Sequence, residues 1–98
     1  MFTGTLALDV LLGDVRSLKE KRSVVRPIVA ELRRRFAVSA AEAGHLDLHR
    51  RSLIGVAVVA ADQAHCAEVL LAAERLVAGR PEIELVSSAT RFNCLDDE

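Results

Sequence analysis

Aromatic side chains are nearly absent from this chain of 98 residues, which has three phenylalanines and neither tryptophan nor tyrosine. Domains that recognise single-stranded RNA on an open β-sheet stack the bases on aromatic rings of the central strands. Here the outward side of the first expected strand carries only small or polar side chains: Thr3, Thr5, Ala7 and Asp9. The composition therefore argues against RNA recognition by base stacking on the sheet.

Cysteines and long apolar runs are also scarce. Cys66 and Cys94 are isolated and lack the spacing of a metal site, so we expect two small buried hydrophobic residues rather than a disulfide. No segment approaches the roughly 18 consecutive apolar residues of a membrane-spanning helix, and the amino-terminal stretch lacks the pattern of a secretory signal. We therefore expect a cytoplasmic protein with no membrane partner.

What the chain does contain is enough apolar material for one folded core. Hydrophobic residues make up 51% of it and charged residues 28%, as in globular proteins, so we expect a single domain over residues 1–98. The net charge is −1, but residues 1–51 carry ten lysines and arginines against six acidic residues (+4), and residues 52–98 carry three against eight (−5). The molecule is electrically polarised unless folding interleaves the two halves.

Four segments have strand character. Residues 2–12 alternate between apolar and mixed positions, which indicates a strand covered on one face. Residues 51–61 include the run I-G-V-A-V-V, which is apolar on both faces and typical of a central strand. Residues 82–92 alternate in their first half. Residues 37–44 are only weakly strand-like, and their place in the order of elements assigns them to a strand.

Two amphipathic helices are expected between these strands. Ser17 begins an S-x-x-E capping box and is followed by an apolar stripe at helical spacing, in a helix that ends near Arg35. Asp62 caps the second helix, and Gly79 ends it. Pro27 lies inside the first helix and lacks a backbone donor, so we expect that helix to be kinked or divided there.

The resulting order of elements is β-α-β-β-α-β. With short connections and right-handed crossovers, this order predicts an α+β, ferredoxin-like fold in which two helices cover one face of a four-stranded antiparallel sheet. Residues 45–50 form a polar connection between the middle strands, and the tail 95–98 is expected to be solvated.

The motif S-L-K-E-K-R at residues 17–22 resembles the S-L-K-x-K-R signature of the YlxP-like family, a group of small bacterial proteins of unknown function. Four later residues match the pattern E-x-G-x-x-D-x-W-x-R that this family tends to show: Glu42, Gly44, Asp47 and Arg51. His49 stands where the family more usually has an aromatic ring. The resemblance covers essentially the whole chain and implies a ferredoxin-like fold. Because such proteins are commonly encoded among transcription and translation factors, it also implies a role near RNA or the ribosome.

The second match also has a purely structural interpretation. Glu42 and Arg51 lie on neighbouring expected strands, where opposite charges pair across a hairpin. Within the same segment, His45 and His49 offer two imidazoles beside one carboxylate, but no fourth metal ligand is apparent. We therefore expect neither a metal site nor a cofactor.

The first helix carries a row of cations that we call the basic ridge: Lys19, Arg22, Arg26 and Arg33. At about 100° per residue the four lie within about 60° of one another beside the apolar stripe, over about 21 Å of helix. Their own helix supplies no counter-charge on that side, so the cations repel one another and a phosphate backbone would relieve the repulsion. The alternative is that folding brings acidic residues such as Glu82 or Glu84 to the basic ridge.

These observations favour a small non-enzymatic binding module that contacts RNA or a ribosomal particle. The expected contacts are the basic ridge, the adjacent motif lysine and two arginines that follow the polar connection: Lys19, Lys21, Arg22, Arg26, Arg33, Arg50 and Arg51. Phosphate contacts make such binding salt-sensitive and largely independent of base sequence. The alternative is a homo-oligomeric protein–protein interaction module or a regulatory module, with no nucleic-acid role. Its bare aliphatic sheet face would be the surface of a homodimer. No nucleophile–base pair or phosphate-binding loop is apparent, so we expect no enzyme activity.

Overall fold

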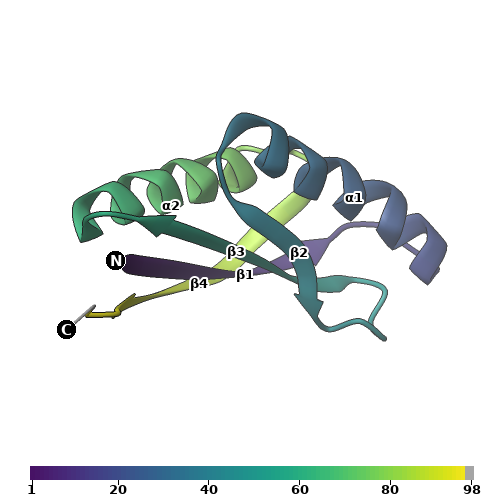
Figure 1. Ribbon diagram of the computed structural model, residues 1–98. Coiled ribbons are helices and arrows are strands. Elements are labelled where there is room, and N and C mark those ends of the chain that lie inside the picture. Colours follow the sequence, from purple (N-terminus) through teal and green to yellow (C-terminus); the bar gives the residue numbers. More distant parts are fainter. Residues whose placement is uncertain (97–98) are drawn as a thin grey trace.

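The computed structural model describes residues 1–96 of the chain. It contains six elements in the predicted order: β1 (Phe2–Leu12), α1 (Leu18–Arg35), β2 (Ser39–Gly44), β3 (Arg51–Ala60), α2 (Gln63–Ala78) and β4 (Ile83–Cys94). The strands form one antiparallel sheet in the order β2-β3-β1-β4, and both helices lie over the same face (Figure 1). The ferredoxin-like prediction is confirmed, and each strand begins and ends within two residues of its expected bounds.

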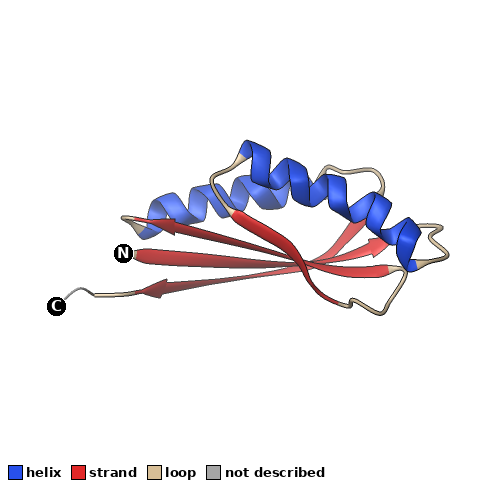
Figure 2. Cartoon of the chain, turned by 45° about the vertical axis from the view of Figure 1, so that its right-hand side comes forward, coloured by secondary structure: helices blue, strands red, loops and turns tan. Residues whose placement is uncertain are grey.

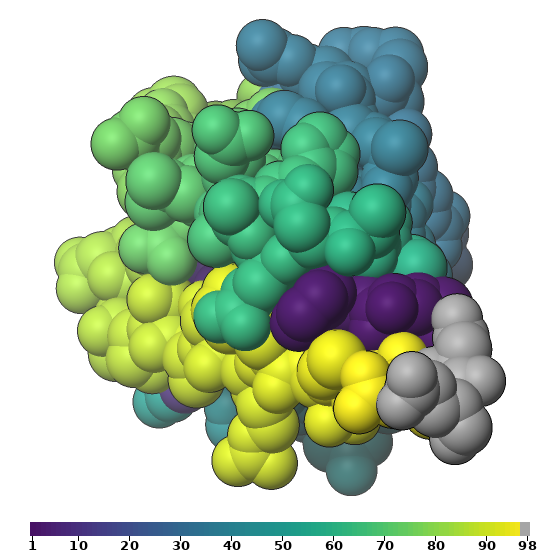
Figure 3. All heavy atoms as spheres, turned by 60° about the vertical axis from the view of Figure 1, so that its left-hand side comes forward, coloured from purple at the N-terminus to yellow at the C-terminus, as the bar shows by residue number. Residues whose placement is uncertain are grey.

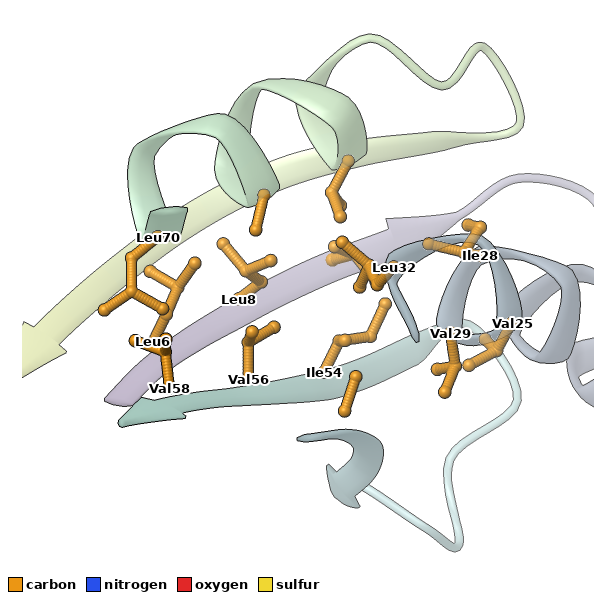
Figure 4. Packing of buried hydrophobic residues seen from close by; sticks show 14 of the residues in the cluster. Leu6, Leu8, Val25, Ile28, Val29, Leu32, Ile54, Val56, Val58 and Leu70 are labelled. Atoms are coloured by element: carbon orange, nitrogen blue, oxygen red, sulfur yellow. The ribbon is translucent and has the colours of Figure 1, made fainter. Parts of the chain in front are cut away.

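The core lies between the two helices and the covered face of the sheet. Alternate residues of β1 point toward the helices, so Leu6, Leu8 and Val10 are buried while their neighbours on the strand face outward. Four residues of α1 at helical spacing pack against this face (Figure 4): Val25, Ile28, Val29 and Leu32. From α2, Leu70 packs against the same strands. The apolar face of the sheet, which alternates along each strand, and the apolar stripes of the two helices therefore form one core.

The amino-terminal end of α1 is held by a modified capping box. The Ser17 hydroxyl accepts a hydrogen bond from the backbone N–H of Glu20 at 3.1 Å. The Glu20 carboxylate accepts in return from the N–H of Arg16 at 2.9 Å, one residue earlier than in the expected box. The helix then runs without interruption through the exposed Pro27, so the proline does not divide it.

The two ends of the chain lie at the same end of the molecule (Figure 3). The N–H of Leu95 donates to the carbonyl of Met1 at 2.9 Å, which extends the pairing of β1 with β4 by one residue. Leu95 is exposed, as expected for the tail, but its backbone is bound to the sheet. The rest of the expected solvated tail, residues 97–98, lies outside the described residues.

The two cysteines differ in their surroundings. Cys66 is fully buried under α2, as expected, and its thiol lies 3.8 Å from the carbonyl oxygen of Phe2. Cys94 is exposed, so the expectation that both cysteines are buried is wrong. The reason is position, because Cys94 is the last residue of an edge strand. Both thiols are free.

The second face of the sheet is bare (Figure 2). We call it the open face; at its centre it carries mainly small side chains. Neither of the two helices in residues 1–96 has the length and apolar character needed to cross a membrane.

Replacing Ile28 by alanine is expected to lower the free energy of unfolding by about 2–5 kcal/mol, because the deletion leaves a cavity where α1 meets the sheet. Urea denaturation followed by circular dichroism measures this change. Leu71→Ala on the exposed side of α2 is the matched control and should change stability by less than about 0.5 kcal/mol. Equal losses in the two variants would contradict this assignment of the core.

Candidate functional site

A buried ammonium group joins α1 to the loop between β2 and β3. The side chain of Lys21 is only 2% exposed, and its Nζ lies 2.9 Å from a carboxylate oxygen of Glu42. The same Nζ donates to the carbonyl of His45 at 2.9 Å and has longer contacts with the carbonyls of Leu46 at 3.4 Å and Arg51 at 3.3 Å. Lys21 therefore ties the start of α1 to both ends of the loop.

The register of β2 explains why a carboxylate is available there. Glu42 pairs with Ile54 of β3, whose side chain faces the helices, so Glu42 also points to the covered side. Its carboxylate accepts a second bond from the hydroxyl of the buried Ser52 at 2.8 Å. With Lys21 and Ser52 as partners, the carboxylate is neutralised and hydrogen-bonded although it lies under the helix.

Two sequence expectations are corrected by this arrangement. Glu42 does not pair with Arg51 across the hairpin; it pairs with Lys21. Lys21 was expected to contact a partner, but its ammonium is enclosed by the protein, so that expectation is wrong. On the helical wheel Lys21 lies about 200° from Lys19, close to the centre of the apolar stripe at about 230°, and this was the signal for its burial.

The loop that Lys21 binds has an unusual backbone at its first residue. His45 adopts φ 55°, in the left-handed region that residues other than glycine seldom occupy. Its carbonyl accepts from both the Lys21 ammonium at 2.9 Å and the N–H of Leu48 at 3.0 Å. These two hydrogen bonds hold the strained residue in place.

Arg51 carries its own counter-ion on the open face. Its guanidinium donates two hydrogen bonds to the carboxylate of Asp9 on β1, at 2.7 and 3.2 Å. The imidazole of His45 lies 3.5 Å from the same carboxylate. The hydrogen bonds from Arg51 are the largest cause that lowers the pKa of Asp9; partial desolvation opposes them, while the charges of Arg51 and His45 add to the lowering. This pairing reduces the charge that Arg51 could offer to a partner.

The basic ridge lies at the surface, as expected. All four of its residues are exposed, and none of the ion pairs found within residues 1–96 involves them. Of the alternative partners Glu82 and Glu84, Glu82 pairs with Arg80 at 3.8 Å instead, and within residues 1–96 neither forms an ion pair with the basic ridge. In the described part of the chain, the basic ridge therefore lacks an internal counter-charge.

Three arginines of the basic ridge line one groove between α1 and the edge strand β2. We call this the basic groove; its volume is about 490 Å³, and its lining includes Arg22, Arg26 and Arg33. The Arg33 guanidinium is fixed to β2, because its Nε donates to the carbonyl of Ala40 at 2.9 Å. Glu42 is the one acidic residue in the lining, and its charge is balanced by Lys21. The basic groove is therefore strongly cationic.

Arg50 does not join the basic groove. It is exposed, and its Nε donates to the carbonyl of Gly13 at 2.9 Å. A separate depression places it among Leu11, Glu82 and Glu84. The structure thus brings three of the seven predicted contact residues into the basic groove, and Lys19 precedes them on α1. Arg50 lies elsewhere, and Lys21 and Arg51 are paired with Glu42 and Asp9. The described residues contain no group of three or more His, Cys, Asp or Glu side chains placed to hold a metal ion.

Comparison with known proteins adds a family but no activity. A family model described as "Protein of unknown function (DUF503)" matches residues 3–90. The uncharacterized protein YlxP of Bacillus subtilis (strain 168) is similar to this chain, with 29% identity over 89 residues that cover 91% of this chain and 97% of that protein. The family match spans Lys21, Glu42 and the whole basic ridge.

Replacing Lys21 by methionine is expected to lower the free energy of unfolding by about 3–5 kcal/mol, because the Glu42 carboxylate then loses its cation in a mostly buried position. The double variant Lys21→Met/Glu42→Leu should recover most of this loss, since neither charge remains. Urea denaturation of the two variants measures both effects. Lys19→Met on the exposed side of the same turn is the control, and the prediction fails if it costs as much as Lys21→Met.

The ion pair of Asp9 is expected to make stability depend on pH in the acid range. Because the folded-state pKa of Asp9 is lowered, its stabilising contribution is complete above the pKa of the unfolded chain and disappears as pH falls through the folded pKa. Asp9→Asn should therefore be less stable than the wild type at about pH 7, and the difference should shrink toward about pH 3. Thermal unfolding over this range tests the prediction, with Asp47→Asn as the control. A constant difference between wild type and Asp9→Asn would contradict it.

Proposed function

The chain belongs to the DUF503 family of proteins of unknown function, and from the geometry of this member we propose that it is a non-enzymatic module that binds the phosphate backbone of RNA through the basic ridge. The partner is RNA, free or within a ribosomal particle. The observation that carries the proposal is the basic groove, where three exposed arginines lie beside a balanced carboxylate and have no acidic partner within residues 1–96.

The spacing of the cations fits a chain of phosphates. Arg22 and Arg26 are one helical turn apart, about 6 Å along the axis, and Arg33 lies about 10 Å further on. A single small anion would contact only one end of such a row. Successive phosphates of a nucleic-acid strand would contact the whole row and release counter-ions from the RNA as they do so.

The groove supports binding to the backbone rather than recognition of bases. Its floor is formed by small or aliphatic residues of α1 and β2, including Val25, Val29 and Ala41. Aromatic rings, which stack on unpaired bases in sequence-specific RNA-binding domains, are absent from this lining as described. Selectivity would then come from the shape of the RNA and the spacing of its phosphates.

The double variant Arg22→Glu/Arg26→Glu tests the proposal. Fluorescence anisotropy with a structured ribosomal RNA fragment, repeated between about 50 and 300 mM salt, gives the affinity and its salt dependence. The wild-type affinity should fall steeply with salt, and the variant should bind at least about 10-fold more weakly at low salt, with a log–log slope smaller by about two units, roughly one for each lost phosphate contact.

A matched control separates the basic groove from net charge. Arg35→Glu/Arg75→Glu makes the same change in charge at exposed positions outside the groove and should bind nearly as tightly as the wild type. Circular dichroism confirms that both variants fold. Equal losses in the two double variants, or wild-type binding that does not respond to salt, would refute the proposal.

A further inference from the structure

The open face of the sheet forms a second surface, on the side away from the helices (Figure 2). A shallow hollow of about 560 Å³ crosses its centre. The outward residues at the centre are Thr5, Ala7, Gly55, Ala57 and Ala89, which lie side by side on the three strands β1, β3 and β4. The outward side chains at the centre of this face are therefore small, and Arg91 is the one charged residue in the lining of the hollow.

Small residues are an unusual choice for exposed strand positions. Alanine and glycine are depleted in strands, because they contribute little side-chain packing and glycine has a high conformational entropy in the unfolded chain. Ala57 and Ala89 are nevertheless both exposed on the open face, where a larger side chain would have room. Small residues at such positions allow another backbone to approach closely.

We propose that the open face is the contact surface of a homodimer, in which a second copy of the chain packs face to face. At ~3.3 Å per residue and ~4.8 Å between strands, the four strands present roughly 600 Å² in plan, and the relief of the side chains adds to this. A standard protein–protein interface buries roughly 800 Å² on each partner. Interfaces at the lower end of the standard range bury roughly 600 Å² on each partner, which the open face can supply, and twisted sheets of the same hand stack in this way.

The charges at the margin of the open face are complementary under a two-fold axis. Arg91 pairs with Thr5, and Asp9 lies four residues further along β1, with the Ala7–Ala89 pair midway between them. A two-fold axis that crosses the strands at this middle pair brings Arg91 of each copy to the level of Asp9 of the other copy. Within residues 1–96, Arg91 has no ion pair of its own, so in the dimer it would share the carboxylate of Asp9 with Arg51 of that copy.

The mass of the nuclease-treated protein in solution tests the proposal. Sedimentation equilibrium should give a dimer of twice the 10.6 kDa chain mass, with a dissociation constant of about 10 µM or lower. Ala57→Lys should raise this constant by roughly 100-fold or more, because an ammonium group would be buried among small side chains and near the cationic Arg91. Ala67→Lys, on the exposed side of α2, should leave it unchanged.

Two further variants keep the result unambiguous. Ala89→Lys on the neighbouring strand β4 should act like Ala57→Lys, and thermal unfolding shows whether each variant remains folded. Arg91→Glu should weaken the dimer by about 10-fold or more, because it places two acidic groups opposite each other. A wild-type monomer at about 100 µM would overturn the proposal. A dimer that resists both lysine substitutions would also overturn it, since another surface would then form the contact.

Discussion

The buried ion pair between Lys21 and Glu42 is the interaction on which the arrangement of α1 and β2 around the basic groove depends. The ammonium group holds the start of α1 against β2 through Glu42 and holds the following loop through backbone carbonyls. The basic groove lies between the same two elements, and Glu42 forms part of its lining. A buried ion pair adds little net stability over a hydrophobic pair of similar volume, but it requires one geometry, because an unpaired charge in that position is costly. The main effect of the ion pair is therefore to fix the position of α1 relative to β2, rather than to add stability.

The periodicity of the sequence predicted three of the strands and both helices, and β2 followed from its place in the order of elements. Alternation in β1 and helical spacing in α1 and α2 each identified the buried face, since local patterns report directly which side of an element is apolar. The exposure of Arg22, Arg26 and Arg33 followed from the same reasoning. The helical wheel placed Lys21 near the apolar stripe, but a local pattern could not show which partner a long side chain finds in another element. For this reason Lys21 and Arg51 were grouped with the basic ridge, whereas the structure pairs them with Glu42 and Asp9.

The two motifs that resemble the family pattern acquire different meanings once the fold is known. In S-L-K-E-K-R, Ser17 and Glu20 form the cap and Lys21 forms the buried ion pair, so half of the motif is structural. Lys19 and Arg22 remain exposed and are free to serve binding.

In the proposed dimer, the two-fold axis across the strands leaves both β2 strands along the same edge of the assembly. Two basic grooves would then open on one side, and an RNA that spans both would bind with avidity rather than with the affinity of one groove.

The contacts of Lys21 also bear on how the chain opens. They join residues 24, 25 and 30 positions apart in the sequence, in a helix, a loop and a strand. None of these segments can separate from the others without exposing a charge that had been neutralised. Local opening of the loop and fraying of the first turn of α1 are therefore coupled, and their backbone amides should exchange with solvent deuterium as one cooperative unit, although α1 would otherwise be free to fray from its end.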